Sequence, residues 1–313
     1  MPSYNQGRFI EESIRSVLLQ GYPDLEFLII DAGSTDESVE IIQKYAPWLA
    51  YWVSEPDRGQ SHAINKGLEK STGTFFNWHN ADDLLTPNSL AMTASALGNY
   101  PEASYVHGYR IIIDQDTKQR RNTKETFAEK IDFVPALKES IAHLTGGMQP
   151  GCLMQRALVC EEGGIDENLH YIMDRDILLR LALQRPPLYI PQSVVFLREH
   201  ADAKSFSWSA EQANERFLLA QKIFSRPVLP SEIRALQRTA LAAAHRFAWK
   251  CYAKAGTRGQ ALRHLGMDIL YSPSGGWSER RRIIKALARQ YSSKWLYRLY
   301  VIMKRAEKLH ECL

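Results

Sequence analysis

Residues 73–87 read Gly-Thr-Phe-Phe-Asn-Trp-His-Asn-Ala-Asp-Asp-Leu-Leu-Thr-Pro, an apolar, aromatic run that stops at two adjacent carboxylates, Asp82 and Asp83. The run predicts a buried strand. Adjacent carboxylates repel each other, so folding alone gives little reason to place them at the end of a core strand. Mg²⁺ and Mn²⁺ prefer oxygen ligands, which makes the pair a candidate metal site. A turn with an acidic helix cap explains the same residues, so this stretch alone leaves both interpretations open.

The preceding and following segments alternate between two patterns. Strand-like segments at 26–31, 51–54, 73–79 and 103–113 alternate with helix-like segments at 9–20, 37–45, 61–70 and 88–100. This order is typical of an α/β fold with a mostly parallel central sheet flanked by helices. Ligands of such sheets bind beyond the carboxyl ends of the strands, where Asp31 and the Asp82–Asp83 pair are found. Residues 1–7 have the composition of a loop that follows a strand, so we expect the first strand to be missing or truncated.

Composition indicates a globular protein with an uneven charge distribution. Hydrophobic residues make up 45% and charged residues 24% of the 313 residues, which is ordinary for a globular protein. The four cysteines form no Cys-x-x-Cys pair, which excludes the usual zinc and disulfide patterns. No apolar run reaches about 18 residues, so no bilayer span is expected.

The charge asymmetry lies in the C-terminal third. Of the 39 Lys and Arg and the 35 Asp and Glu, 20 and 7 respectively lie from residue 210 onward, so this region carries +13 and the first 209 residues carry −9. We therefore predict two domains, a catalytic domain at 1–208 and a basic helical region at 209–313. Segment 293–308 is amphipathic and cationic. The segment either lies on an anionic membrane or belongs to a helical subdomain that packs on the catalytic domain with its basic face in solvent.

Polar motifs elsewhere offer further candidate site residues. Asp57 lies in a polar turn, and Lys66 on the helix that follows it is a candidate phosphate ligand. Asp174 lies near a predicted helix start, and Asp176 with Arg180 forms an i,i+4 ion pair on that helix. His200 follows the strand-like run 188–197 and could bind a metal or a diphosphate. A turn, a helix cap and a surface histidine are the simpler explanations of Asp57, Asp174 and His200.

Taken in order, the motifs resemble those of the family 2 glycosyltransferases of the GT-A type, over roughly residues 1–205. The matching pieces are Pro2-Ser-Tyr-Asn5, Ile30-Asp-Ala-Gly-Ser-Thr-Asp36, Asp57-Arg-Gly59, Asn65-Lys-Gly67, Asn80-Ala-Asp-Asp83, Gly163-Gly-Ile-Asp-Glu167, Met173-Asp-Arg-Asp176 and Arg198-Glu-His200. The resemblance implies a GT-A-like fold and an inverting, metal-dependent transfer. The sugar would move from a nucleotide-diphospho-sugar (UDP-, GDP- or dTDP-linked) to a hydroxyl of a glycan or lipid-linked acceptor. The setting implied is polysaccharide biosynthesis.

The resemblance also assigns roles to residues. Asp174 matches the catalytic base; the metal ligands for Mg²⁺ or Mn²⁺ would be Asp82, Asp83 and His200; and the donor-binding residues would be Pro2, Tyr4, Asp31 and Asp57, together with Lys66 and Asp82. Two positions depart from the family pattern. Asn80 replaces the first Asp that many members carry in the acidic motif, and Met173 replaces a common Glu before the base.

Two other classes of function remain as alternatives. A nucleotidyltransferase uses a similar sheet and acidic site, but residues 1–10 lack the glycine-rich basic loop that usually binds its triphosphate. A non-catalytic module that binds sugar nucleotides or nucleic acid is the second alternative. The three acidic clusters would repel a polyanion, so no nucleic-acid partner is expected. The predicted location is cytoplasmic, with peripheral contact at the inner face of the membrane.

Overall fold

The computed structural model describes residues 1–114, 119–122, 133–145, 149–200 and 209–272. The chain divides into two compact units, residues 1–141 with 145–206, and residues 142–144 with the chain from 207 onward. The domain boundary predicted at 208/209 lies two residues from this division.

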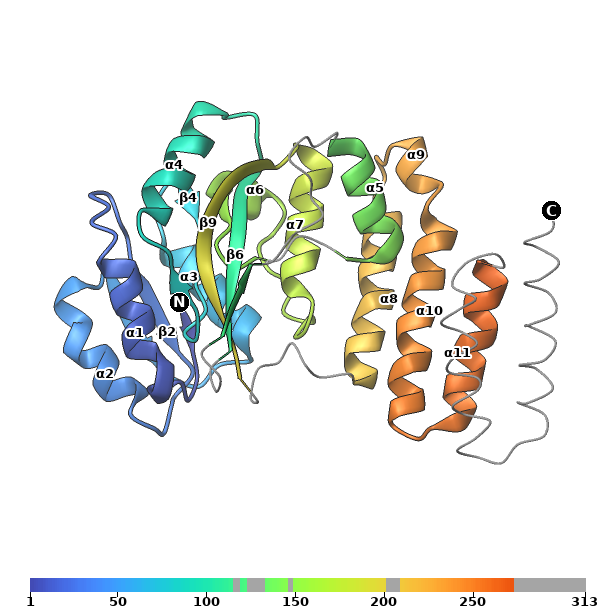
Figure 1. The fold of residues 1–313 in the computed structure, drawn as a ribbon, viewed down its shortest axis with the longest axis horizontal. Coiled ribbons are helices and arrows are strands. Elements are labelled where there is room, and N and C mark those ends of the chain that lie inside the picture. The colour runs from blue at the N-terminus through green and yellow to red at the C-terminus, as the bar shows by residue number, and fades with distance from the viewer. Residues whose placement is uncertain (115–118, 123–132, 146–148, 201–208, 273–313) are drawn as a thin grey trace. The chain divides into compact units, whose positions relative to one another are not determined.

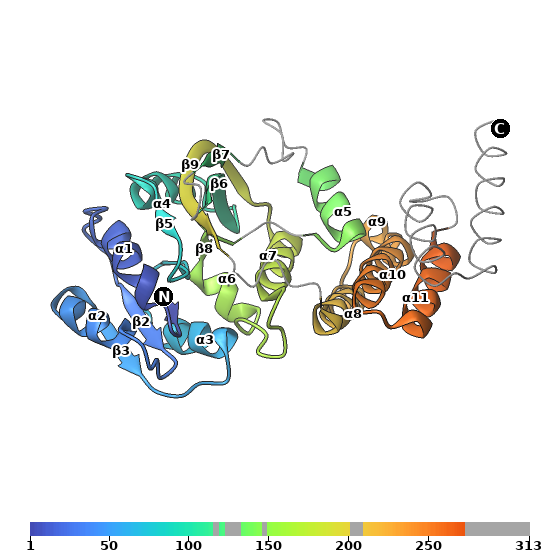
Figure 2. The same cartoon turned by 60° about the horizontal axis from the view of Figure 1, so that its bottom comes forward.

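Sheet A forms the N-terminal part of the first unit. It has three parallel strands in the order β1 (Pro2–Ser3), β2 (Leu28–Asp31) and β3 (Tyr51–Ser54). Helices α1 (Gly7–Leu18) and α2 (Ser38–Tyr45) pack on one side of the sheet and α3 (Gln60–Lys70) on the other (Figures 1 and 2). A short 3₁₀ helix, Ala46–Trp48, follows α2. This confirms the predicted α/β order, in which each helix crosses between parallel strands.

The first strand is short but present. Pro2 pairs with Ile30 and Ser3 with Asp31, and the carbonyl oxygen of Met1 accepts a hydrogen bond of 2.9 Å from the amide of Ile30. The stretch that we interpreted as a loop therefore contains two residues of ladder, because Pro2 and Ser3 lie beside the buried edge of β2.

Sheet B is mixed rather than mostly parallel. Its order is β4 (Phe75–Phe76), β8 (Leu153–Gln155), β6 (Tyr105–Asp114), β9 (Leu188–Glu199) and β5 (Leu84–Leu85), with β7 (Arg120–Asn122) paired to β6. Among the strands of sheet B that the structure describes, only the pair β6 and β9 runs parallel. A helical crossover imposes parallel pairing only on the strands that it joins, and most neighbours in sheet B come from distant parts of the chain.

Helices of the first unit cover sheet B and complete the core. They are α4 (Ser89–Asn99), α6 (Arg156–Glu161) and α7 (Met173–Gln184), whereas α5 (Phe133–His143) crosses the division between the two units after residue 141. Trp78, Met154 and Leu178 lie in the largest hydrophobic cluster, which α3, α6 and α7 enclose with sheet B. The predicted pair of Asp176 and Arg180 is confirmed as a buried ion pair of 2.7 Å on α7. Arg180 also donates to two backbone carbonyls of the segment before α7, which fixes that segment on the helix.

The second unit is helical. It contains α8 (Ala210–Phe224), α9 (Ser231–Arg234), α10 (Gln237–Lys254) and α11 (Arg258–Tyr271). α10 packs against both α8 and α11 (Figure 1). Fully buried Trp249 on α10 donates to Asp268 of α11. The cationic segment 293–308 lies outside the described residues.

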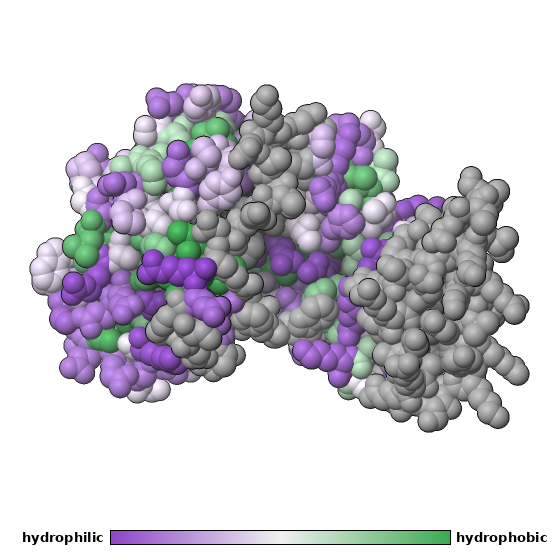
Figure 3. Space-filling model, viewed as in Figure 1, coloured by the Kyte–Doolittle hydropathy of each residue, from purple (hydrophilic) through white to green (hydrophobic). Residues whose placement is uncertain are grey.

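In the part of the chain that the structure describes, no helix is both long and apolar enough to cross a bilayer. On the face of the first unit drawn in Figure 3, hydrophobic residues lie in small separate patches within a largely hydrophilic surface. Single exposed apolar residues such as Leu19 and Trp48 are ordinary for a globular protein.

Candidate active site

The pairing of β5 with β9 brings the acidic motif to His200. Leu84 pairs with Phe196 and Leu85 with Val195 in an antiparallel ladder, so residues just before β5 lie opposite residues at the end of β9. As a result, Nε2 of His200 lies 3.3 Å from Oδ2 of Asp82 although 118 positions separate them. The backbone amide of Arg198 donates to Oδ1 of Asp83 at 3.3 Å. The structure therefore brings the predicted residues 82, 83 and 200 together.

Asp83 is a buried carboxylate held by its neighbours. It is 4% exposed, and its Oδ2 accepts a hydrogen bond of 3.0 Å from the side-chain amide of Asn80. Burial, followed by the charge of Asp82, raises the pKa of Asp83 to about 8. Asn80, which departs from the family pattern, thus supplies an N–H donor where another carboxylate would add repulsion.

The loop after β3 reaches the same motif. Gln60, the first residue of α3, donates through its side-chain amide to Oδ1 of Asn80 at 3.2 Å. Asp57 accepts a hydrogen bond of 2.7 Å from the amide of Gly59, which shapes the turn just before it. The hydroxyl of Ser13 on α1 donates to the carbonyl oxygen of Asn80 at 3.1 Å. The carboxyl edge of sheet A and the acidic motif of sheet B therefore meet around Asn80.

His200 is fixed by aromatic contact. The ring centroids of His200 and Phe9, on α1, lie 4.8 Å apart. The guanidinium carbon of Arg198 lies 5.3 Å from the ring centroid of Phe9. Arg198 also pairs with Glu12 on α1. Nδ1 of His200 is buried, and no described residue lies within hydrogen-bonding distance of it. Phe9 was missed by the sequence reasoning, which placed it only at the start of a predicted helix.

Asp174 occupies the first turn of α7. Its Oδ1 accepts a hydrogen bond of 2.8 Å from the amide of Arg175, and a backbone amide at Gln149 also donates to the carboxylate. Burial raises the pKa of Asp174, while the charge of Arg175 opposes the shift. The carboxylate is therefore more basic than a solvent-exposed aspartate, which suits a group that accepts a proton.

Arg110 is a buried cationic residue in the middle of sheet B. It lies in β6, is 2% exposed, and burial lowers its pKa. The negative charges of Asp174 and Asp83 are among the effects that oppose that shift. The sequence offered one signal for Arg110, a charged residue in the middle of a predicted strand.

Asp31 is enclosed rather than open to a ligand. Its carboxylate is 0% exposed and accepts from the hydroxyls of Ser34 at 2.6 Å and Ser54 at 2.7 Å. The amides of Gly33 and Ser34 add bonds of 3.1 and 2.9 Å. Asp31 therefore holds the turn after β2 in this structure, and its contact with a donor stays a prediction.

The other predicted donor-binding residues lie around sheet A. Pro2 is buried in β1, and Tyr4 just after it is 59% exposed. Lys66 on α3 pairs with Glu55 of the preceding turn. Their roles in donor binding also stay predictions.

No complete metal site is built from side chains alone. Among the described residues, no group of three His, Cys, Asp or Glu is arranged to hold a metal ion. Asp82 and His200 supply two neighbouring candidate ligands. The side chain of Asp82 is 27% exposed, so a ligand from solvent can reach it. The donor set of carboxylate oxygens and an imidazole suits Mn²⁺ or Mg²⁺ once a ligand adds further oxygens.

Comparisons with known proteins identify relatives. The family model described as Glycosyl transferase family 2 matches residues 1–163. An uncharacterized glycosyltransferase of Rickettsia typhi is 27% identical over 222 residues, which cover 69% of this chain and 67% of that protein. An uncharacterized glycosyltransferase of Mycobacterium tuberculosis is 28% identical over 191 residues, 60% of this chain and 69% of the relative. A match to a Rickettsia conorii glycosyltransferase covers 36% of that longer protein.

Solved structures share the fold at low sequence identity. The crystal structure of TarS 1-349 from S. aureus in complex with UDP-GlcNAc superposes with a TM-score of 0.68 at 16% identity, covering 91% of this chain and 81% of that chain. A mannosyltransferase from Pyrobaculum calidifontis in complex with GDP-Man and Mn²⁺ gives a TM-score of 0.57 at 20% identity, covering 98% and 85%. These similarities confirm the predicted fold class.

Proposed function

The chain belongs to glycosyl transferase family 2, and from that premise we propose that it moves a sugar from a nucleoside-diphosphate donor to a hydroxyl acceptor with inversion at the anomeric carbon. As a member of this family it is a glycosyltransferase, which sets aside the nucleotidyltransferase and the non-catalytic binding module. The proposal concerns the donor, the metal and the roles of the residues.

Asp82, Asp83 and His200 would hold the divalent cation. Nε2 of His200 lies beside Oδ2 of Asp82, and this pairing of an imidazole nitrogen with carboxylate oxygens fits a cation better than it fits an apolar or anionic neighbour. Mn²⁺ or Mg²⁺ bound there would stabilise the charge of the departing diphosphate. The Mn²⁺ in the Pyrobaculum mannosyltransferase complex supports this assignment.

Asp174 would act as the general base. A carboxylate with a raised pKa takes the proton from the acceptor hydroxyl as the hydroxyl oxygen attacks the anomeric carbon. The bond from that carbon to the diphosphate oxygen breaks in the same step, and single displacement inverts the configuration. Arg110 would keep Asp174 and Asp83 in one electrostatic environment.

The donor would be a UDP-, GDP- or dTDP-linked sugar. TarS was crystallised with UDP-GlcNAc and the mannosyltransferase with GDP-Man, which supports a nucleoside diphosphate without choosing the base. Pro2, Tyr4, Asp31, Asp57 and Lys66 are the proposed donor-binding residues. We propose a glycan or lipid-linked acceptor, which would bring the cationic segment 293–308 to an anionic membrane surface; no role for nucleic acid is included.

The distance of 3.3 Å between Nε2 of His200 and Oδ2 of Asp82 is the observation that carries the proposal, because it joins two motifs that lie 118 positions apart in the chain. A panel of nucleotide sugars with Mn²⁺, assayed for release of the nucleoside diphosphate, tests it. Asp174→Asn should lower turnover at least about 100-fold and leave donor affinity unchanged. Glu161→Gln, an exposed residue at the end of α6, is the matched control. Near-normal turnover of Asp174→Asn would remove the base assignment.

A further inference from the structure

Two motif pieces of the sequence have no role so far, Asn65-Lys-Gly67 on α3 and Gly163-Gly-Ile-Asp-Glu167 between α6 and α7. The structure brings them together across 100 positions of the chain. The side-chain amide of Asn65 donates to the carbonyl oxygen of Ile165 at 2.8 Å, and its Oδ1 accepts from the backbone amide of the same residue at 2.9 Å. Two hydrogen bonds between one side chain and the backbone of one residue fix both the distance and the orientation of the partners.

Two glycines make room for the Asn65 side chain. A Cβ atom at Gly164 would lie 2.8 Å from Oδ1 of Asn65, which is too close unless one of them shifts. Gly163 and Gly164 also have φ values of +79° and +77°, in the left-handed region that favours glycine. The backbone of residues 163–170, which we call the linking segment, is thus shaped to receive this side chain.

Glu167 connects the linking segment to the turn after β3. Its Oε2 accepts hydrogen bonds of 2.7 and 3.2 Å from the guanidinium of Arg58, and its Oε1 accepts one of 3.2 Å from the side-chain amide of Asn65. Arg58 directly follows Asp57, a proposed donor-binding residue. The linking segment is therefore attached next to the turn where the donor is expected.

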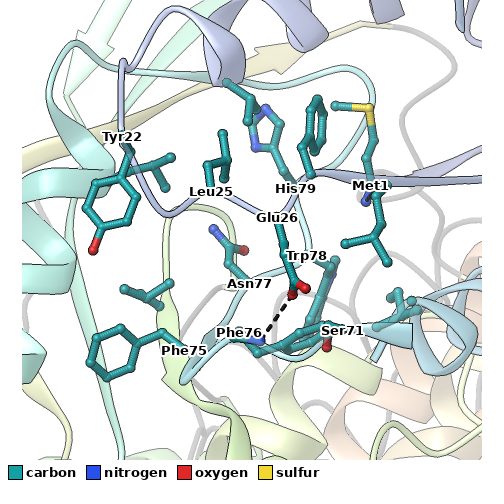
Figure 4. Close-up of a pocket in the computed structure, with 18 of the residues that line it drawn as sticks. Met1, Tyr22, Leu25, Glu26, Ser71, Phe75, Phe76, Asn77, Trp78 and His79 are labelled. Carbon is teal, nitrogen blue, oxygen red and sulfur yellow. Dashed lines mark hydrogen bonds between the residues drawn. The ribbon is translucent and has the colours of Figure 1, made fainter. Parts of the chain in front are cut away.

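Buried contacts hold the same segment against α3. The hydroxyl of Ser61, which is 2% exposed, donates to the carbonyl oxygen of Leu169 at 2.9 Å. Leu169 lies in one hydrophobic cluster with Ile64, Phe76 and Trp78, and the last three also line a cavity of about 470 Å³ (Figure 4). A void gives a side chain no packing partner on that side. The polar contacts with the linking segment therefore supplement the packing that fixes α3.

The linking segment leads directly into the first turn of α7. Arg180 on α7 donates to the carbonyl oxygen of Gly164 at 2.8 Å, so the segment is bound from this side as well. Ile172, which precedes α7, is 0% exposed. Asp174 follows Glu167 by only seven positions. A movement of the linking segment relative to α3 would therefore displace the carboxylate of Asp174.

We propose that Asn65 and Glu167 are positioning residues for the transfer: they hold the linking segment on α3 and thereby place the base Asp174 relative to the donor-binding turn at 57–59. The inference rests on the proposed function, which makes Asp174 the base. A displacement of about 1 Å at a reacting group can lower a rate on the order of 100-fold. Both residues act through the backbone that bears Asp174, so their loss should lower kcat far more than donor affinity.

Two substitutions with opposing effects test the proposal. Asn65→Asp keeps the acceptor for the amide of Ile165, loses the N–H donor and puts a second carboxylate beside Glu167. Its kcat should fall at least about 10-fold, with donor affinity within about twofold of the wild type. Glu167→Gln alone weakens the contact with Arg58 and should lower kcat about threefold. In the Asn65→Asp background, Glu167→Gln removes the repulsion and supplies an N–H donor, so there it should raise kcat at least about threefold.

Turnover is measured with Mn²⁺ as release of nucleoside diphosphate from the sugar nucleotide that the wild type uses best, in a panel that includes UDP-GlcNAc and GDP-mannose. Calorimetry with the same compound gives the donor affinity, and thermal unfolding checks that each variant is folded at the assay temperature. Glu69→Gln, an exposed residue on α3, is the matched control and should behave as the wild type.

Wild-type kcat in Asn65→Asp, or an equal fall in kcat and donor affinity, would overturn the proposal. A further loss of kcat when Glu167→Gln is added to Asn65→Asp would also overturn it, because two merely structural disruptions add up. If Asn65→Asp does not fold, Glu167→Gln decides alone, since its side chain is 32% exposed: wild-type kcat in this variant overturns the proposal.

The Asp174→Asn variant separates this inference from the proposed function. Loss of turnover in Asp174→Asn without any loss in Asn65→Asp would overturn the positioning role alone. Near-normal turnover in Asp174→Asn would overturn the base assignment and the positioning role together.

Discussion

Replacing Asp83 by asparagine should stabilise the metal-free protein at alkaline pH although it removes a proposed metal ligand. Burial and then the charge of Asp82 raise the pKa of Asp83 to about 8, from an ordinary value of 3.8. Because the pKa in the folded state lies above that in the unfolded state, the bound proton favours folding. This contribution is complete below about pH 4 and is lost as the pH rises through 8.

The size of the effect follows from the two pKa values. Between pH 6 and pH 8 the folded protein loses about half a proton at Asp83, and the free energy of unfolding falls by about 2 kcal/mol from this group alone. Asparagine resembles the protonated acid but does not titrate, so the variant loses no unfolding free energy at this position. His79 and the Met1 amine have lowered pKa values and act in the opposite direction, so the difference between wild type and variant is the quantity to measure.

Urea denaturation at pH 6, 7 and 8 with a chelator present supplies that difference. The free energy of unfolding of Asp83→Asn relative to the wild type should increase by about 2 kcal/mol between pH 6 and pH 8. Glu161→Gln should show the same pH dependence as the wild type. If the free energy of unfolding of Asp83→Asn changed with pH by the same amount as that of the wild type, the raised pKa of buried Asp83 would be refuted.

Two further predictions concern buried carboxylates that stabilise the fold. Ser54→Ala removes a hydroxyl that donates to the fully buried Asp31 and should lower the free energy of unfolding by about 1.5–3 kcal/mol, whereas Ser95→Ala on the exposed side of α4 should change little. Equal stability of the two variants would contradict the role given to Asp31. Asp176→Asn removes the nearer of the two carboxylates that pair with buried Arg180, leaving Glu162 at 3.5 Å, and should lower the free energy of unfolding by about 3 kcal/mol. A loss below 1 kcal/mol in urea denaturation would mean that the pair behaves like a surface ion pair.

The sequence predicted what is local. Periodicity located the helices of residues 1–100 within about two residues, since each has its own apolar face. The i,i+4 pair of Asp176 and Arg180 followed from helix geometry alone. The candidate site was predictable only through the order of motifs, because no single motif distinguishes a ligand site from a turn or a cap.

The non-local features could not be predicted. The contact of Asp82 with His200 depends on the β5–β9 register, and the position of Phe9 against His200 depends on how α1 packs beside that ladder. The mixed strand directions of sheet B also depend on pairing between strands that lie far apart in the chain. Asp31 gives a further example. Its place at the end of a predicted strand suggested a carboxylate available to a ligand, but the hydroxyl of Ser54 on β3 donates a hydrogen bond to that carboxylate.

Donor binding by calorimetry, with Mn²⁺ and with a chelator, tests the metal-bearing site most directly. Wild type and Glu161→Gln should bind the preferred nucleotide sugar at least about 10-fold more tightly with Mn²⁺ than with chelator, and Asp82→Asn should bind it weakly in both conditions. If Asp82→Asn retained wild-type affinity in Mn²⁺, or if the chelator left wild-type affinity unchanged, the site at Asp82, Asp83 and His200 would not be the place where the donor diphosphate is held.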